Sequence, residues 1–172
     1  VTGFDSSKRG EQTVTLAYGA AKTDITVTVL KPAGDDITVT FSLLGDTVHG
    51  DEGEKHTLVD GNLAKWIDSA QITVGNNATA LDVIVKALGD QYTIDNPSGN
   101  YIKSITPKDG KTLSELSNGS LSGWMFTVNG IHGDLGVAQQ YLNDGDVIVF
   151  HYTDDYGKEY EADQNRKQSA DE

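Results

Sequence analysis

The chain has 172 residues, of which 37% are hydrophobic, enough to form a core, so wholesale disorder is not expected. Lys and Arg total 13 against 26 Asp and Glu, a net charge of −13 that argues against binding to nucleic acid or anionic lipid. The lack of cysteine excludes disulfides and thiolate sites, and no apolar run approaches the roughly 20 residues that span a bilayer.

The first predicted elements are two β-strands, residues 13–18 and 25–29. Both alternate β-branched or large apolar residues with small or polar ones, a period of two that is typical of strands with one buried face. A linker, residues 31–34, follows them. Because two strands alone are marginally stable in water, we expect this pair to lean on the next domain or on another chain.

A new strand pattern covers residues 37–43 and is followed by a polar stretch, residues 45–61. We expect a short helical turn around Leu63, Trp66 and Ile67, and then a short strand at residues 72–74. The clearest helix is Thr79–Leu88, with Thr79 as N-cap, Asp82 near its positive end and Gly89 after its last turn. The predicted apolar stripe consists of Leu81, Ile84, Val85 and Leu88.

Three further strands are predicted at residues 101–105, 124–128 and 147–152. The last is apolar on both faces, which indicates the centre of a sheet. Residues 158–172 are polar without a period, and we expect a mobile tail or linker there. The element order predicts an α+β, mostly β fold, specifically a β-grasp-like mixed sheet with one packed helix.

The sequence offers little that is catalytic. Residues 119–123 place Leu121 where a Gly-x-Ser-x-Gly nucleophile elbow needs serine, and no phosphate-binding loop is present. We therefore expect no enzyme activity.

The densest group of candidate metal ligands is His49, Asp51, Glu54 and His56. Two imidazoles and two carboxylates within eight residues could hold zinc or a hard cation. Their spacing matches no metal motif, so a solvated acidic loop is the alternative interpretation.

Two stretches resemble known families. Residues 1–29, VTGFDSSKRGEQTVTLAYGAAKTDITVTV, resemble the closing strands of a bacterial immunoglobulin-like surface repeat. A complete sandwich needs about seven strands, so this is an incomplete Ig-like sandwich. From Ser122, the sequence SGWMFTVNGIHGDLGVAQQYLNDGDVIVFHYTDDYGKE resembles the DUF4430 family, and upstream patterns extend the likeness over residues 36–160.

DUF4430 is similar to the C-terminal β-domain of transcobalamin and intrinsic factor, which carry vitamin B12. The elements shared with these carriers fall here on Trp124, on Gly136-Val137-Ala138 and on Asp144-Gly145. In the carriers this domain contacts one face of a flat corrin, which a helical barrel covers from the other side. The resemblance thus implies cobalamin or another corrinoid as ligand, and a ligand-facing surface made of Trp124, Met125, Leu135, Gly136 and Val137.

The alternative for these residues is structural. Trp124 alternates with Phe126 and Val128 as in an ordinary core strand, and Gly136 suits a turn.

We predict three segments: the end of an Ig-like repeat at residues 1–32, a DUF4430 domain at residues 33–157, and a tail or linker at residues 158–172. The chain begins at Val1 without a leader, which suggests an excised segment. The expected function is that of a non-catalytic structural or recognition module on the cell surface or in the cell wall of a Gram-positive bacterium. Its expected partners are neighbouring domains and host or matrix ligands, and strand pairing could give a dimer. A corrinoid half-site completed by another domain is the alternative function.

Overall fold

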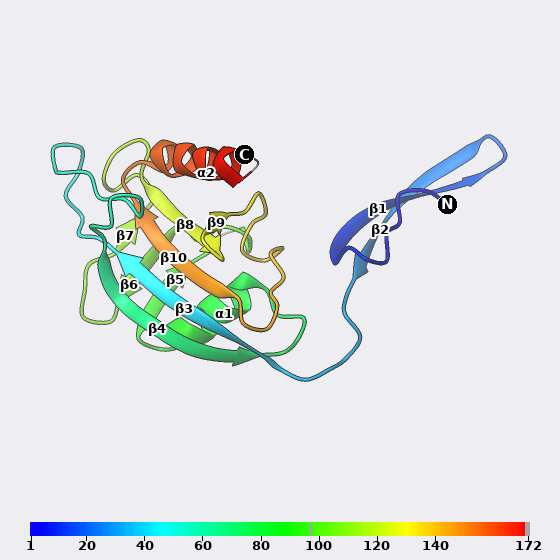
Figure 1. Cartoon of the computed structure of the whole chain (residues 1–172), viewed down its shortest axis with the longest axis horizontal. Coiled ribbons are helices and arrows are strands. Elements are labelled where there is room, and N and C mark those ends of the chain that lie inside the picture. Colours follow the sequence, from blue (N-terminus) through cyan, green and yellow to red (C-terminus); the bar gives the residue numbers. More distant parts are fainter. Residues whose placement is uncertain (97, 171–172) are drawn as a thin grey trace.

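The computed structural model describes residues 1–96 and 98–170, and Figure 1 shows them. Strands β1 (Gly10–Tyr18) and β2 (Ala21–Val29) form an antiparallel hairpin, which confirms the first two predicted strands. The predicted buried face is wrong for most of its length, because Val14 is 4% exposed but Leu16 is 36% and Tyr18 is 93% exposed. A two-stranded ribbon has no second layer to cover these side chains.

The hairpin touches the rest of the chain through Arg9. The Arg9 guanidinium donates hydrogen bonds to the carbonyl oxygens of Asn76 (3.0 Å) and Leu142 (2.7 Å) and lies 5.1 Å from the centre of the Tyr141 ring. These contacts join the base of the hairpin to the loops at one end of the main sheet, while β1 and β2 project away from the main domain (Figure 1).

The main sheet has five strands in the order β4-β3-β10-β8-β9. Strand β10 (Val147–Thr153) lies at its centre, parallel to β3 (Ile37–Gly45) and antiparallel to β8 (Gly123–Val128), which confirms the prediction for the last strand. Strand β9 (Ile131–His132) pairs only with Thr127 and Val128. The sheet is therefore mixed, and residues 123–126 of β8, which β9 does not cover, form its edge.

Strand β4 (Ala64–Val74) replaces the helical turn predicted around Trp66, and that prediction is wrong. Ile67 pairs with Leu43 of β3, and the register shifts between Phe41 and Leu43, where Ser69 adopts a φ of 51°. A β-bulge bends the strand and interrupts its alternation, so the apolar spacing imitates a helix.

Helix α1 (Ala80–Leu88) confirms the predicted helix and its cap, because the Thr79 and Asp82 side chains form a capping box. The buried stripe differs from the prediction and consists of Ala80, Val83, Ile84 and Leu88. Val85 is 53% exposed. The whole helix surface near its centre is apolar, so the sequence alone does not fix which side faces the core.

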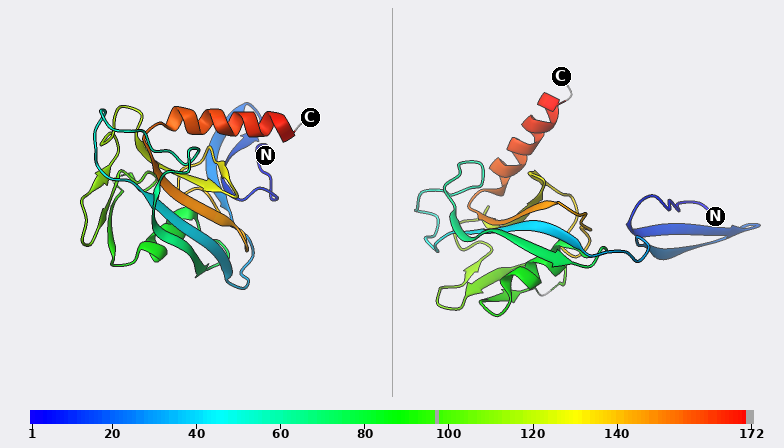
Figure 2. Two further views of the ribbon diagram at one scale, coloured as in Figure 1. Left: turned by 60° about the vertical axis from the view of Figure 1, so that its left-hand side comes forward. Right: turned by 60° about the horizontal axis from the view of Figure 1, so that its bottom comes forward.

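A second sheet of three short strands lies beside α1: β5 (Tyr92–Asp95), β6 (Ser104–Pro107) and β7 (Leu113–Ser114). The sequence missed β5, and the strand predicted at residues 101–105 begins only at Ser104. This sheet and α1 lie on one side of the main sheet (Figure 2), and the hydrophobic core fills the space between them. Phe41, Leu43, Ile84, Ile105, Phe150 and Tyr152 belong to that core.

Helix α2 (Tyr156–Ala170) covers most of the predicted tail or linker, whose residues 171–172 lie outside the described part of the chain, and the described residues hold two helices instead of the one that was predicted. It covers the opposite side of the main sheet from α1 (Figure 2). The buried contacts of α2 are carboxylates, Glu159 at 0% and Asp163 at 4% exposed. A helix docked by polar groups leaves no apolar stripe in the sequence. The three-segment division of the chain remains a prediction.

Among the described residues, no helix is both long and apolar enough to cross a membrane.

Candidate functional site

A pocket of about 190 Å³ opens beside β8, and all five residues of the predicted ligand surface line it. Trp124 and Met125 come from β8, and Leu135, Gly136 and Val137 come from the loop after β9. The remaining lining residues are Asn100, Tyr101, Ile102, Phe126, His132, Gly133, Phe150 and Tyr160. The structure thus brings the predicted residues together and adds a side chain from α2, which the sequence analysis did not assign to this site.

Trp124 lines the pocket and also belongs to the core. It is 5% exposed, stacks on Phe150 with ring centres 5.4 Å apart, and its indole N–H donates to the Leu113 carbonyl at 3.0 Å. Because the ring is almost completely buried and its N–H is already bonded, a ligand could contact only a small part of the ring surface. Trp124 is therefore a core residue that also lines the pocket, and its contact with a ligand remains a prediction.

Position 136 has no room for a side chain, because the side chain of Asn100 packs directly against the Gly136 backbone. A Cβ atom at this position would lie 2.2 Å from the Asn100 side-chain amide, which in turn accepts a hydrogen bond from the Ala138 N–H at 3.2 Å. Close packing against Asn100 thus fixes the loop that forms one pocket wall. Leu135 in the same loop is 50% exposed and is free to contact a ligand.

The rim of the pocket carries a few polar groups. The Tyr101 hydroxyl donates to the Glu115 carboxylate at 3.0 Å, and burial, followed by this carboxylate, raises the pKa of Tyr101. This hydroxyl therefore stays protonated at neutral pH. Asn100, His132 and Tyr160 supply further polar groups of the lining. A mostly apolar pocket with a few polar groups is the usual form of a small-ligand site.

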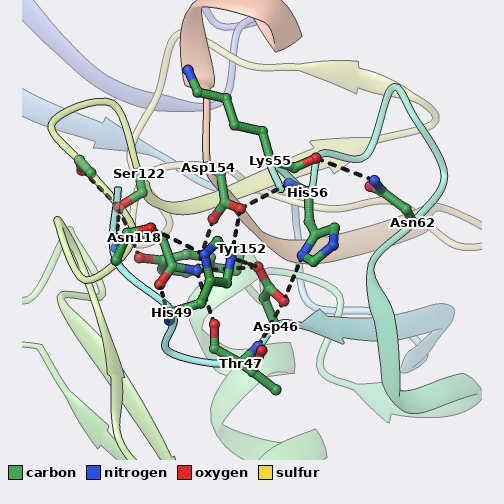
Figure 3. Close-up of polar contacts among 12 residues, drawn as sticks. Asp46, Thr47, His49, Lys55, His56, Asn62, Asn118, Ser122, Tyr152 and Asp154 are labelled. Carbon is green, nitrogen blue, oxygen red and sulfur yellow. Dashed lines mark hydrogen bonds and ion pairs between the residues drawn. The ribbon is translucent and has the colours of Figure 1, made fainter. Parts of the chain in front are cut away.

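A second polar site, which we call the loop cluster, consists of Asp46, His49, His56 and Asp154 (Figure 3). Nε2 of His49 lies 3.1 Å from the Asp46 carboxylate and 3.0 Å from that of Asp154. Nδ1 of His56 lies 2.9 Å from the other oxygen of Asp46. Burial alone would lower the pKa of His49, but the hydrogen bond from Asp46 and the charges of Asp154 and Asp46 outweigh it and raise that pKa.

The loop cluster keeps two of the four predicted metal ligands, His49 and His56, while Asp51 and Glu54 lie outside it. Asp46 follows directly after β3 and Asp154 directly after β10. These strands are parallel neighbours, so their carboxyl ends meet at one edge of the sheet. The sequence shows both aspartates but not the parallel pairing that joins them. Metal binding by this loop remains a prediction.

Asn118 holds the loop cluster together. Its amide nitrogen lies 2.9 Å from Asp154, 3.2 Å from Asp46 and 3.0 Å from the Thr47 carbonyl, and its oxygen accepts the His49 N–H at 2.9 Å (Figure 3). Asn118 is 4% exposed. Asn118 therefore joins both aspartates and the backbone of His49 in one set of hydrogen bonds.

Comparison with protein families places the pocket in a known domain. Residues 77–154 match the domain of unknown function DUF4430. This part of the chain is a DUF4430 domain. The DUF4430 match is shorter than the predicted residues 36–160, yet it contains every pocket residue except Tyr160. Residues 1–29 match the bacterial Ig-like domain of group 3.

Neither the curated proteins nor the solved structures contain a match to the chain. Bacterial Ig-like domains are typical of surface proteins, and an Ig-like segment implies neighbouring domains. The combination with DUF4430 therefore indicates a module of a bacterial surface protein.

Proposed function

We propose that the chain is a non-catalytic recognition module on the surface of a Gram-positive bacterium, and that the pocket beside β8 is its ligand site. The observation that carries the proposal is the convergence of Trp124, Met125, Leu135, Gly136 and Val137 on one pocket. These residues come from two separate segments, and a mostly apolar concavity at an open sheet edge serves binding better than it serves acid–base chemistry.

The pocket and the charge of the chain narrow the class of ligand. A volume of about 190 Å³ accepts a single ring or a short apolar group rather than a whole polycyclic molecule. The net charge of −13 disfavours anionic ligands. We therefore propose a neutral or cationic ligand that inserts one flat, apolar part between Trp124 and Leu135.

We infer that the domain is β-grasp-like, and the packing of α1 on the mixed five-stranded sheet supports this inference. In this proposal the N-terminal hairpin is the end of an Ig-like sandwich, which positions the domain within the parent protein. The ligands of the domain are host or matrix molecules. Pairing of the open hairpin edges between chains would be a second mode of association, and the molar mass from light scattering distinguishes a monomer from such a dimer.

Protein-observed NMR with a library of small aromatic fragments tests the pocket. We expect shift changes to cluster at Trp124 and at residues 133–137, and to disappear in Leu135→Lys. Val85→Lys is the matched control, because Val85 is exposed to a similar degree, 53% against 50%, and lies outside the pocket. Shifts that ignore the pocket, or that survive Leu135→Lys unchanged, would refute the proposal.

A corrinoid half-site is the second candidate, favoured because three of the residues that resemble those of the B12 carriers, Trp124, Gly136 and Val137, line the pocket. A corrin would lie across the opening, since it exceeds the pocket volume, and would need another domain to cover its other face. We expect weak tryptophan quenching by cobinamide in a Trp66→Phe variant, where Trp124 is the remaining tryptophan. The absence of quenching at millimolar cobinamide would remove this candidate for the isolated chain, and turnover of a hydrolase substrate would contradict the non-catalytic assignment.

A further inference from the structure

A group of buried polar side chains lies between the main sheet and helix α2. It contains His132 of β9, His151 of β10 and Glu159 of α2, and we call it the buried triad. Their exposed fractions are 5%, 0% and 0%. One ring nitrogen of each histidine and one carboxylate oxygen of Glu159 all lie within 4.8 Å of one another. The neighbours of His151 along β10, Phe150 and Tyr152, point into the hydrophobic core, so His151 faces α2.

The outer nitrogens of the two rings have fixed partners. Nδ1 of His132 lies 2.8 Å from the Asp163 carboxylate, and Nδ1 of His151 lies 3.2 Å from the Tyr152 carbonyl oxygen. Asp163 also accepts the His132 backbone N–H at 2.9 Å and a hydrogen bond from Arg166, as an ionised carboxylate does. Because carboxylate and carbonyl oxygens only accept, each Nδ1 carries a proton.

The inner nitrogens face each other. Nε2 of His132 lies 3.0 Å from Nε2 of His151. With both Nδ1 atoms protonated, two neutral rings would direct two lone pairs at one point, and this is repulsive without a cation between them. One extra proton would relieve this contact. A metal ion would relieve it as well, and ligands about 2.0–2.1 Å from a tetrahedral zinc ion are themselves about 3.3 Å apart.

The hydrogen bonding of Glu159 favours a metal ion over a single proton between the two histidine rings. Its Oε1 accepts hydrogen bonds from the Leu58 N–H at 2.7 Å and the Thr153 hydroxyl at 3.1 Å. Its Oε2 is buried and has no hydrogen-bond partner among the described residues. A single proton between the two rings leaves this oxygen unsatisfied, whereas a divalent cation can accept both nitrogens and the carboxylate together.

The surroundings of the buried triad match those of metal-binding histidines. Such histidines usually donate their second ring N–H to a carboxylate or a backbone carbonyl, which orients the ring and makes the ligand more basic. His132 does so to Asp163, and His151 does so to Tyr152. The hydroxyl of Thr127, which pairs with His132 across β8 and β9, is also buried without a partner among the described residues and could hold a water molecule on the ion.

We propose that His132, His151 and Glu159 bind a divalent transition-metal ion, for which zinc is the best fit, and that this ion fastens α2 to the main sheet. Two imidazoles and one carboxylate suit zinc better than the hard cations calcium and magnesium. The two positive charges of the ion balance Glu159 and Asp163. The buried triad shares His132 with the lining of the pocket, but the proposal does not depend on the ligand of the pocket.

Zinc titration of the full chain tests the proposal, after removal of metal with a chelator. The His49→Gln/His56→Gln variant is used throughout, because it disables the loop cluster and leaves the buried triad intact. We expect one equivalent of zinc to bind, with a rise in melting temperature, and cobalt to give the visible absorption of a tetrahedral site. His151→Gln and Glu159→Gln should each weaken binding by more than 100-fold, and Asp163→Asn by about 10- to 100-fold.

Buried variants can fail to fold, so ¹⁵N NMR of the histidine rings provides a second measurement on the folded His49→Gln/His56→Gln protein. With equimolar zinc we expect both rings to be protonated at Nδ1 alone, with Nε2 shifted by the metal. A His132 ring that keeps both protons in the presence of zinc would overturn the proposal. Zinc binding that disappears with the loop cluster, or that is unchanged in Glu159→Gln, would overturn it as well.

Discussion

Replacing Asn118 with alanine should destabilise the loop cluster, because the Asn118 side-chain amide forms hydrogen bonds with four groups there. Its nitrogen serves the carboxylates of Asp154 and Asp46 and the Thr47 carbonyl, and its oxygen accepts the His49 N–H. The Asp154 side chain is completely buried, so a lost donor is not readily replaced by water. An acceptor left unsatisfied in the interior costs more than an exposed one.

The size of the effect follows from these bonds. A hydrogen bond to a buried carboxylate contributes about 2 kcal/mol and a neutral one about 1 kcal/mol, so the loss of one bond of each kind in Asn118→Ala is enough to reduce the free energy of unfolding by about 3 kcal/mol. For a chain of this length, that loss corresponds to a fall in melting temperature of about 6–12 °C.

Urea unfolding followed by tryptophan fluorescence measures the change directly. Asn62→Ala is the control: Asn62 belongs to the same polar stretch, is exposed, and among the described residues its side chain forms hydrogen bonds only with the backbone of Thr57 (2.9 Å) and Lys55 (3.3 Å). We expect this variant to lose about 1 kcal/mol or less. A loss below about 1 kcal/mol in Asn118→Ala, or equal losses in both variants, would refute the view that the amide stabilises buried charge.

Two further substitutions test the fold. Gly45→Ala should reduce the free energy of unfolding by about 1–3 kcal/mol, because the new Cβ would lie 1.9 Å from the Trp66 indole. Gly75→Ala is the control: the space around Gly75 is open, so the free energy of unfolding should change by less than about 0.5 kcal/mol. Equal urea midpoints for the two variants would contradict this prediction. Arg9→Ala should free the hairpin, seen as faster amide exchange in residues 10–29 with an unchanged melting temperature of the main domain, and unchanged exchange would show that other contacts hold it.

Local sequence patterns predicted the strands with regular alternation and the helix with an apolar face. The alternation in residues 37–43 and the cap at Thr79 led to β3 and α1, and the two-sided apolar pattern of the last strand indicated its central position. The bulged strand β4 and the polar-faced helix α2 were missed. A bulge breaks the period of two, and a helix held by Glu159 and Asp163 shows no apolar stripe.

The sites divide in the same way. The resemblance of the sequence to a known family picked out five of the residues that line the pocket, among them Trp124 and Gly136, while the other lining residues, such as Tyr160 of α2, are brought there only by the fold. Only the tertiary structure decided which histidines meet carboxylates. The parallel pairing of β3 with β10 joins Asp46 to Asp154, and the docking of α2 brings Glu159 to His132 and His151. Such contacts depend on long-range packing, for which sequence spacing carries no signal.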